Sequence, residues 1–152
     1  MSNHTYYEDY QIGEQFITPA RTIGETEVSM FAMLTGDFNR LHTDAEYMKD
    51  SLFGERIAHG LLGMAIVNGL KYRTAINPDG IVAFLGVNWN FVAPILFNDT
   101  IHAVMHVESK RETRHSDRGI VVFAIEVLNQ RADVVQRGTM TMMMKRQATA
   151  VE

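Results

Sequence analysis

The pattern of apolar positions along the chain changes after residue 75. Beyond that point, segments rich in Val, Ile, Phe and Thr are separated by Gly, Asn, Asp or clusters of charge, a composition typical of strands. We predict four antiparallel strands, the last two joined by a tight turn near 130–133. The predicted strands are 81–93, 100–108, 119–129 and 134–145.

Before residue 75, a tail, one strand, loops and helical segments are predicted. Residues 1–13 read as a tail that leads into a first strand near 14–22. The segment 27–34 then predicts a helix, which Thr26 would cap and Gly36 would end.

A polar loop, 36–42, follows this helix. The sequence TDAE at 43–46 has the form of a capping box and predicts a short helix that ends near residue 51. After a second loop, 52–59, a long apolar segment begins at Gly60 and continues to about residue 75. Its apolar residues surround a helical projection, so we expect a helix that is buried on most sides.

The order of one strand, several helices and four strands predicts an α+β domain. The long apolar helix would lie against one face of an antiparallel sheet of about five strands. The other face and the free edges of the sheet favour dimerisation.

Composition limits the class of protein further. A chain of 152 residues fits one domain, and 46% hydrophobic with 21% charged residues is a globular composition. The net charge of −4 argues against a nucleic-acid partner. There is no cysteine, which excludes disulfides, thiolate metal sites and a cysteine nucleophile, and suits a reducing cytoplasm.

The sequence indicates neither a membrane segment nor a signal peptide. The N-terminus is polar and acidic, whereas a signal peptide would be basic and then apolar. The longest nearly uncharged stretch, 57–70, is too short to span a bilayer. We therefore predict one cytoplasmic domain, 1–152, without a membrane partner.

Several familiar kinds of chemistry lack their motifs. No G-x-S-x-G elbow, phosphate-binding glycine loop or dinucleotide fingerprint is present. His102 and His106 have a spacing that suits a metal on a helix, but they fall in a predicted strand, where such residues lie about 13 Å apart. We predict no bound metal and no separate cofactor.

Asp37 and His42 remain as the main candidates for chemistry. A carboxylate and an imidazole brought together can hold one water molecule and share its protons during a reaction. The spacing by itself slightly favours a structural reading, in which Asp37 caps a turn and His42 is a hydrogen-bonded structural histidine.

His59, Gly60 and Asn68 form a second group of candidates. Gly60 begins the long helix, where free backbone N–H groups and the helix dipole favour developing negative charge. The glycine is also explained if it only lets the loop enter the helix closely. Asn68 is the plainly polar side chain of this helix, and it either faces the same cavity or is structural.

Two motifs carry a family resemblance. Residues 34–42, LTGDFNRLH, followed by residues 53–62, FGERIAHGLL, closely resemble the MaoC-like dehydratases, including the R-specific enoyl-CoA hydratases. The two motifs cover about 30 residues in the family's order and separation. The later strands are compatible, so the resemblance spans nearly the whole chain.

The resemblance implies a hot-dog fold, in which a curved antiparallel sheet wraps round the helix that begins at Gly60. It implies a homodimer, or a higher homo-oligomer, whose sheets join edge to edge with the acyl-thioester tunnel near the interface. Asp37 and His42 would bind and activate water, the Gly60 N–H would receive the thioester oxygen, and Asn39 would brace the loop. His59 is expected to support the site. Coenzyme A or an acyl-carrier phosphopantetheine arm would carry the substrate.

Two positions depart from the family pattern. Arg40 stands where the motif usually has proline, which loosens the loop and places a cation near the mouth of the site. Asn68 stands where some R-specific hydratases have a serine that supports the site. An amide can still donate and accept hydrogen bonds, but it is larger.

The resemblance predicts reversible syn hydration of a trans-2-enoyl thioester to an R-3-hydroxyacyl thioester. In this hypothesis Asp37 is the base toward water, and His42 orients the water and supplies the proton at C2. Two alternatives stay open: a hot-dog thioesterase, in which a carboxylate activates water against the thioester carbonyl, and a non-catalytic acyl-CoA-binding module.

Overall fold

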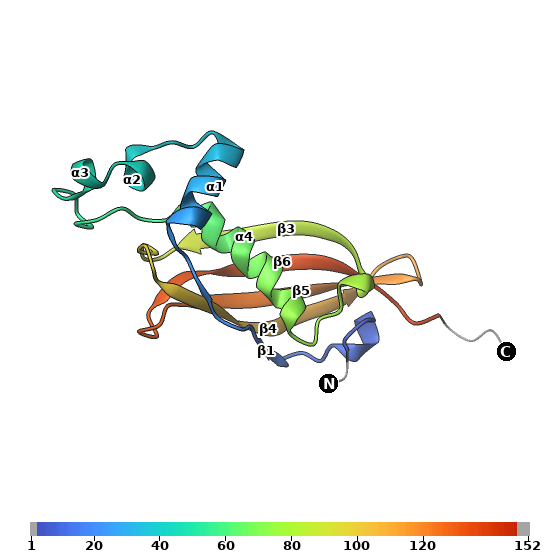
Figure 1. Cartoon of the computed structure of the whole chain (residues 1–152). Helices are drawn as coiled ribbons and strands as arrows, with labels where there is room; N and C mark the ends of the chain where they lie inside the picture. The colour runs from blue at the N-terminus through green and yellow to red at the C-terminus, as the bar shows by residue number, and fades with distance from the viewer. Residues whose placement is uncertain (1–2, 149–152) are drawn as a thin grey trace.

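An antiparallel sheet curves around the helix α4, Gly60–Leu70, in the computed structural model, which describes residues 3–148 (Figure 1). Within those residues the sheet has six strands in the order β1-β4-β5-β6-β3, with β2 also paired to β4. The strands are β1 (Gln15–Ile17), β2 (Arg21–Thr22), β3 (Ile81–Phe91), β4 (Thr100–Glu112), β5 (Arg118–Leu128) and β6 (Val134–Lys145).

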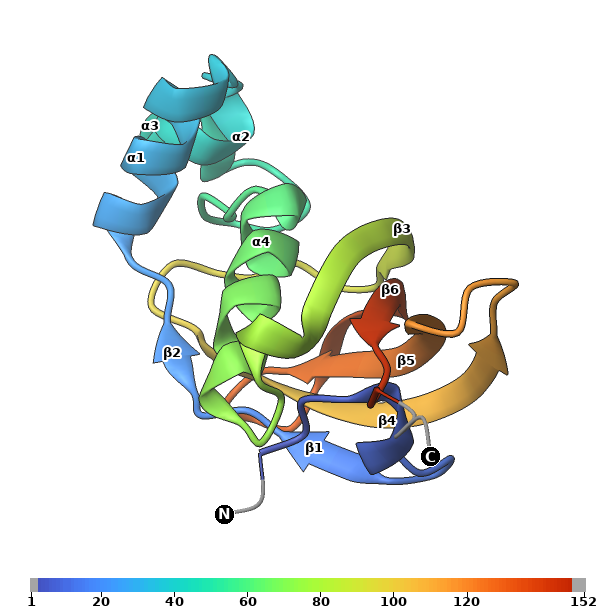
Figure 2. The same ribbon diagram turned by 90° about the vertical axis from the view of Figure 1, so that its right-hand side faces the viewer.

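The helices α1, α2 and α3 form a projection beside the N-terminal end of α4, as the two ribbon views show (Figures 1 and 2). None of the helices in the described part of the chain is long and apolar enough to cross a membrane. The α-helices of the projection are α1 (Glu25–Thr35), α2 (Arg40–Thr43) and α3 (Ala45–Met48), and the 3₁₀ helices are η1 (Tyr7–Asp9), η2 (Lys71–Arg73) and η3 (Pro78–Gly80).

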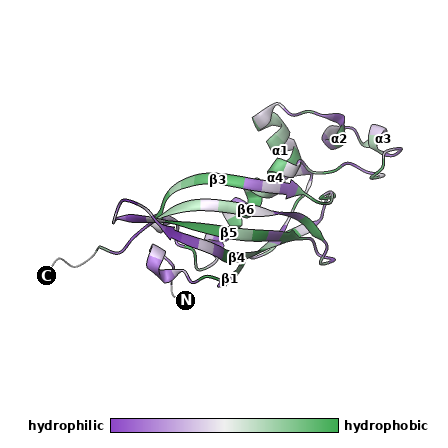
Figure 3. Ribbon diagram, turned by 180° about the vertical axis from the view of Figure 1, so that it is seen from behind, coloured by the Kyte–Doolittle hydropathy of each residue, from purple (hydrophilic) through white to green (hydrophobic). Residues whose placement is uncertain are grey.

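The core lies between α4 and the concave face of the sheet. Buried and partly exposed residues alternate along the first part of β4, as expected for a strand with one face inside. Figure 3 shows hydrophobic colour along the central strands and hydrophilic colour on the β4–β5 hairpin. The buried side chains of the three central strands include Ile101, Met105, Val107, Val121, Phe123, Ile125, Met140, Met142 and Met144.

The sequence places the four later strands correctly, and the tight turn near 130–133 is present. The predicted first strand is instead two short strands, β1 and β2. Pro19 stands between them and has no amide hydrogen with which to continue the ladder. The predicted tail does lead into β1, but Tyr10 is only 1% exposed and belongs to the core.

Two predicted helix caps are wrong by one or two residues. The helix α1 begins at Glu25, because the Glu27 carboxylate accepts a hydrogen bond from the Gly24 amide at 2.9 Å. The cap of α3 is Asp44, whose side chain accepts from the Tyr47 amide. Gly36 ends α1 as predicted, in the left-handed conformation at φ +78°.

The long apolar helix is shorter and more exposed than predicted. It ends at Leu70, and the 3₁₀ helix η2 follows it. Leu62, Gly63 and Val67 face the sheet and are buried, whereas Leu61 is 56% exposed. Within the described chain, α4 is therefore covered on one side, and its outer side remains open.

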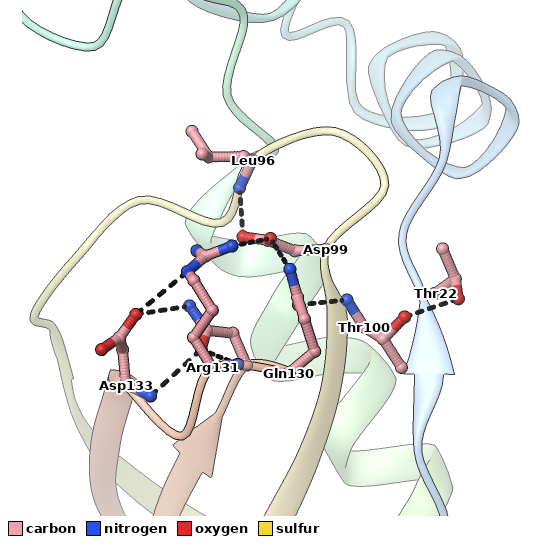
Figure 4. Close-up of polar contacts among 8 residues, drawn as sticks. Thr22, Leu96, Asp99, Thr100, Gln130, Arg131 and Asp133 are labelled. Carbon is pink, nitrogen blue, oxygen red and sulfur yellow. Dashed lines mark hydrogen bonds and ion pairs between the residues drawn. The ribbon is translucent and has the colours of Figure 1, made fainter.

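Asp99 ties the loop after β3 to the turn between β5 and β6 (Figure 4). Its carboxylate, in a residue only 2% exposed, accepts hydrogen bonds from the Leu96 amide at 2.9 Å, Gln130 Nε2 at 2.7 Å and Arg131 Nη1 at 3.1 Å. Burial alone would raise the pKa of Asp99, but these donors outweigh burial and hold the pKa below its usual value.

We expect Asp99→Asn to lower the free energy of unfolding by about 1–3 kcal/mol, because an amide nitrogen would face donors that need an acceptor. Urea denaturation at pH 7 measures the change. The loss should shrink as the pH falls through the pKa of native Asp99, since the wild-type carboxylate then takes up a proton and loses its advantage. Asp133→Asn, at a more exposed carboxylate of the same turn, is the control. Equal stability of the two variants would contradict this role of Asp99.

Candidate active site

The segment between α1 and α2 positions Asp37 and His42. The Asn39 side chain accepts from the Leu41 amide at 3.0 Å and so caps α2, which carries His42. The backbone N–H of Asn39 in turn donates to Asp37 Oδ1 at 3.3 Å. These two contacts are the means by which Asn39 holds the loop.

His42 is held in one tautomer by its surroundings. It is 8% exposed, and its Nδ1 lies 2.7 Å from the Ile57 carbonyl oxygen. A carbonyl only accepts, so Nδ1 carries the proton and, in the neutral ring, Nε2 keeps a lone pair. This contact also joins the Asp37 loop to the segment that enters α4.

His59 lies directly against His42. The two imidazole rings stack with centroids 3.7 Å apart and planes 29° apart. His59 Nε2 donates to the Asp37 carbonyl oxygen at 3.0 Å, and the side chain is 2% exposed. Its Nδ1 is buried and has no hydrogen-bond partner among residues 3–148.

The fold therefore brings together residues that are far apart in the sequence. One carboxylate oxygen of Asp37 and one ring nitrogen each of His42 and His59 lie within 4.8 Å of one another. Groups this close could share one water molecule, and two imidazoles with a carboxylate could also hold a divalent cation. The absence of a metal stays a prediction.

A cavity of about 380 Å³ lies beside this group, and His42 and Gly60 both line it. Gly60 is the first residue of α4, and the ring of Phe91 lies so close that a Cβ there would sit 2.7 Å from it. Most of the wall is apolar. The lining residues are His42, Phe53, Ile57, Ala58, Gly60, Leu61, Phe91, Val92, Ala93, Pro94, Ile95 and Gln136.

The pKa of His42 lies below its usual value. Burial is the largest cause, and the neighbouring His59 lowers the pKa further, whereas the Ile57 carbonyl and the Asp37 carboxylate raise it. His42 is therefore neutral at pH 7, with its Nε2 lone pair available as a proton acceptor.

Arg40 and Asn68 lie outside the cavity wall. Arg40 pairs with Asp44 at 2.9 Å and stacks over the Tyr47 ring at 3.9 Å. Asn68 accepts a hydrogen bond from Lys71, whose burial lowers its pKa to about 8. Asn68 thus provides a hydrogen-bond acceptor for a buried ammonium group. This contact favours the alternative in which Asn68 has a structural role and does not face the cavity.

Sequence reasoning missed Gln136 and the loop 92–95. Gln136 is a buried polar residue that lines the cavity, and its only signal is a polar residue within an otherwise regular strand. The loop 92–95 is positioned by contacts far along the chain, such as the Ala58 amide donating to the Ile95 carbonyl at 2.8 Å.

The chain belongs to the MaoC-like dehydratase family. The family described as "MaoC like domain" matches residues 9–127. "Protein MaoC" of Klebsiella aerogenes is 34% identical over 109 residues, which are 71% of this chain but only 31% of that protein. The "(R)-specific enoyl-CoA hydratase" of Rhodospirillum rubrum is 31% identical over 102 residues, 67% of this chain and 69% of that protein.

Solved structures confirm the predicted hot-dog fold. A structure described as "Monoamine oxidase regulatory protein" from Archaeoglobus superposes with a TM-score of 0.88 and 34% identity, covering 95% of this chain and 97% of that one. A Mycobacterium tuberculosis protein with a "double hotdogfold" superposes with a TM-score of 0.85 at 16% identity, covering 97% of this chain and 46% of that one.

We predict that the His42 ring titrates in the folded protein with a midpoint below about 6.5, the usual value for histidine. Replacing His59 by Phe should move the midpoint upward, because a neighbour that lowers the pKa is removed. NMR titration of the imidazole Cε1–H signals measures both values. A wild-type midpoint at or above 6.5 would contradict the assignment.

Proposed function

We propose that this protein is an enzyme, a hydro-lyase that adds water reversibly to the double bond of a trans-2-enoyl thioester and forms an R-3-hydroxyacyl thioester. The observation that carries the proposal is that the pair of Asp37 and His42 adjoins the cavity on which the N-terminus of α4 opens. Asp37 and His42 lie side by side, and the N-terminus of α4 at Gly60 opens on the same space as His42. These groups are a water-activating pair and a donor for the thioester oxygen.

In the proposed reaction, one water molecule lies between the Asp37 carboxylate and His42 Nε2. The water oxygen adds to C3 of the enoyl group, its proton passes to Nε2, and the thioester oxygen gains enolate charge beside the Gly60 N–H. His42 then returns the proton to C2 from the same face, which completes syn addition.

This order refines the hypothesis drawn from the sequence, which made Asp37 the base. A neutral imidazole with a lone pair on Nε2 must receive a proton before it can donate one to C2. Asp37 then orients the water and stabilises the imidazolium. His59 supports both residues, through the ring stack on His42 and the hydrogen bond to the Asp37 backbone.

The cavity wall supports an acyl thioester as substrate. Apolar side chains form most of it, which suits an acyl chain, and its volume is within the usual range for small-molecule sites. Coenzyme A or an acyl-carrier arm would present the acyl group. The proposed chemistry needs only the groups of these site residues, and we propose that it uses no separate cofactor. The cysteine-free composition supports a cytoplasmic location.

We expect Asp37→Asn to reduce hydration of crotonyl-CoA by about 10²–10⁴-fold while the protein stays folded, because the carboxylate that orients the water is lost. Loss of the enoyl-thioester absorbance, recorded with EDTA present, measures the rate. Asp50→Asn, at an exposed carboxylate in the turn after α3, is the matched control.

A thiol reagent in the same assay separates the alternatives. Release of free coenzyme A would favour a thioesterase, and binding without turnover would favour an acyl-CoA-binding module. Near-normal hydration by folded Asp37→Asn would overturn the assignment of Asp37.

We further propose that two copies of the chain associate through β3. This strand is an end of the sheet, and an open sheet edge pairs readily with another strand. Apart from Asn88 and Asn90, its exposed side chains are apolar, an unusual feature for a free edge. They are Val82, Phe84, Leu85, Val87 and Phe91.

Leu85→Lys should shift the protein from dimer toward monomer in light scattering after size exclusion. Leu85 is 46% exposed and lies at a bulge in the β3–β6 pairing, so the lysine would meet the partner strand and not the core. Ile17→Lys, on β1 at the other end of the sheet, should leave the mass unchanged. A monomeric wild-type protein would disprove association through β3.

A further inference from the structure

Gln136 is a buried amide that joins β6 to the first residue of α4. It is 1% exposed and lines the cavity. Its Nε2 donates to the Gly60 carbonyl oxygen at 2.9 Å, and its Oε1 accepts from the Trp89 indole at 3.1 Å. Because an indole N–H can only donate, Trp89 fixes the amide orientation and directs the NH₂ group at Gly60.

The helix leaves space for this amide. Gly63 lies inside α4, and a Cβ there would be 2.7 Å from Gln136 Nε2 and 2.6 Å from Ile95 Cδ1. Glycine destabilises a helix interior relative to alanine, so a residue with a side chain would be favoured if the space were not needed. Gly63 thus allows Gln136 to reach across the helix to Gly60.

The hydrogen bond acts on a peptide unit with a free donor. The Gly60 carbonyl and the Leu61 N–H belong to the same planar trans peptide and point in opposite directions. The Leu62 and Gly63 amides both donate to the His59 carbonyl, at 3.1 and 3.3 Å. Within residues 3–148, the Gly60 and Leu61 amides have no acceptor.

Holding the oxygen end of this peptide has two effects. It fixes the direction of the Leu61 N–H, and it polarises the peptide, because a hydrogen bond accepted by a carbonyl strengthens the donor at the other end. Both effects matter most where charge develops on a substrate in a site shielded from water.

We propose that Gln136 is a positioning residue of the oxyanion site, which holds the Gly60–Leu61 peptide so that the Gly60 and Leu61 N–H groups together receive the thioester oxygen. The inference rests on the proposed function and adds to it a second backbone donor and the side chain that orients it. Trp89 is part of the same hydrogen-bonded arrangement, because its indole N–H orients Gln136.

The test replaces Gln136 by Met, which has similar length and no donor. We expect kcat for crotonyl-CoA hydration to fall about tenfold, between the effect of one neutral hydrogen bond and that of a whole oxyanion donor, with KM within about twofold of wild type. The midpoint of the His42 titration should not move. Gln15→Met, at an exposed site on β1, is the control.

A second readout follows the bound thioester directly. Butyryl-CoA labelled with ¹³C at the carbonyl has no double bond to hydrate, and its infrared carbonyl stretch should shift to lower frequency in the wild-type site. The shift should diminish in Gln136→Met. Should this variant fail to fold, Trp89→Phe serves, since it keeps an aromatic ring and removes the donor that orients Gln136; it should lose kcat and carbonyl shift in the same direction.

The outcomes separate this inference from the proposed function. Hydration by the wild type with unchanged kcat and carbonyl frequency in the folded variants would overturn the role of Gln136 and leave the hydratase standing. A wild-type carbonyl shift that the variants diminish, without any hydration, would overturn the hydratase and support Gln136. A wild type that neither hydrates crotonyl-CoA nor binds butyryl-CoA would overturn both.

Discussion

The close approach of α4 to the sheet at its first turn is the constraint on which the site depends. Gly60 lies against the Phe91 ring and Gly63 against Ile95 and Gln136, so closely that a Cβ at either glycine would force these side chains to shift. This contact lets the first turn of α4 open on a cavity walled mostly by apolar side chains. The positive dipole of this turn and the Gly60 and Leu61 amides, which have no acceptor within residues 3–148, lie at that opening. Leu62 and Val67 then anchor the rest of the helix on the sheet.

A series of hydrogen bonds to backbone carbonyls connects the Asp37 loop to the start of α4 and to the sheet. His42 bonds to the Ile57 carbonyl, and one residue further the Ala58 amide bonds to the Ile95 carbonyl. The loop that holds Ile95 is in turn fixed by Asp99. The Asp37 loop is thus connected to the sheet through the segment that enters α4. This connection explains why residues of a projecting region keep a defined geometry.

The electrostatics of the site follow from unequal burial. The imidazoles of His42 and His59 are buried and stacked, and burial is the largest cause of the lowered pKa of His42. The side chain of Asp37, by contrast, is exposed to solvent. A carboxylate beside a neutral imidazole is the arrangement that a shared water requires, and the ring tautomer is set by a backbone carbonyl on another segment.

The sequence by itself determined those features that depend on local pattern: the strands β5 and β6 to within a residue, the end of α1 at Gly36, the start of α4 at Gly60 and the proximity of Asp37 and His42. Alternation, glycine conformation and motif spacing are local, so they can be read along the chain. Only the tertiary structure decided that His59 stacks on His42, that Gln136 holds Gly60, and that Asn68 serves Lys71 instead of the cavity. The first two contacts join segments that neither helical nor strand periodicity relates. The third depends on the burial of Lys71, whose ammonium group lies near the rings of Tyr72 and Phe84.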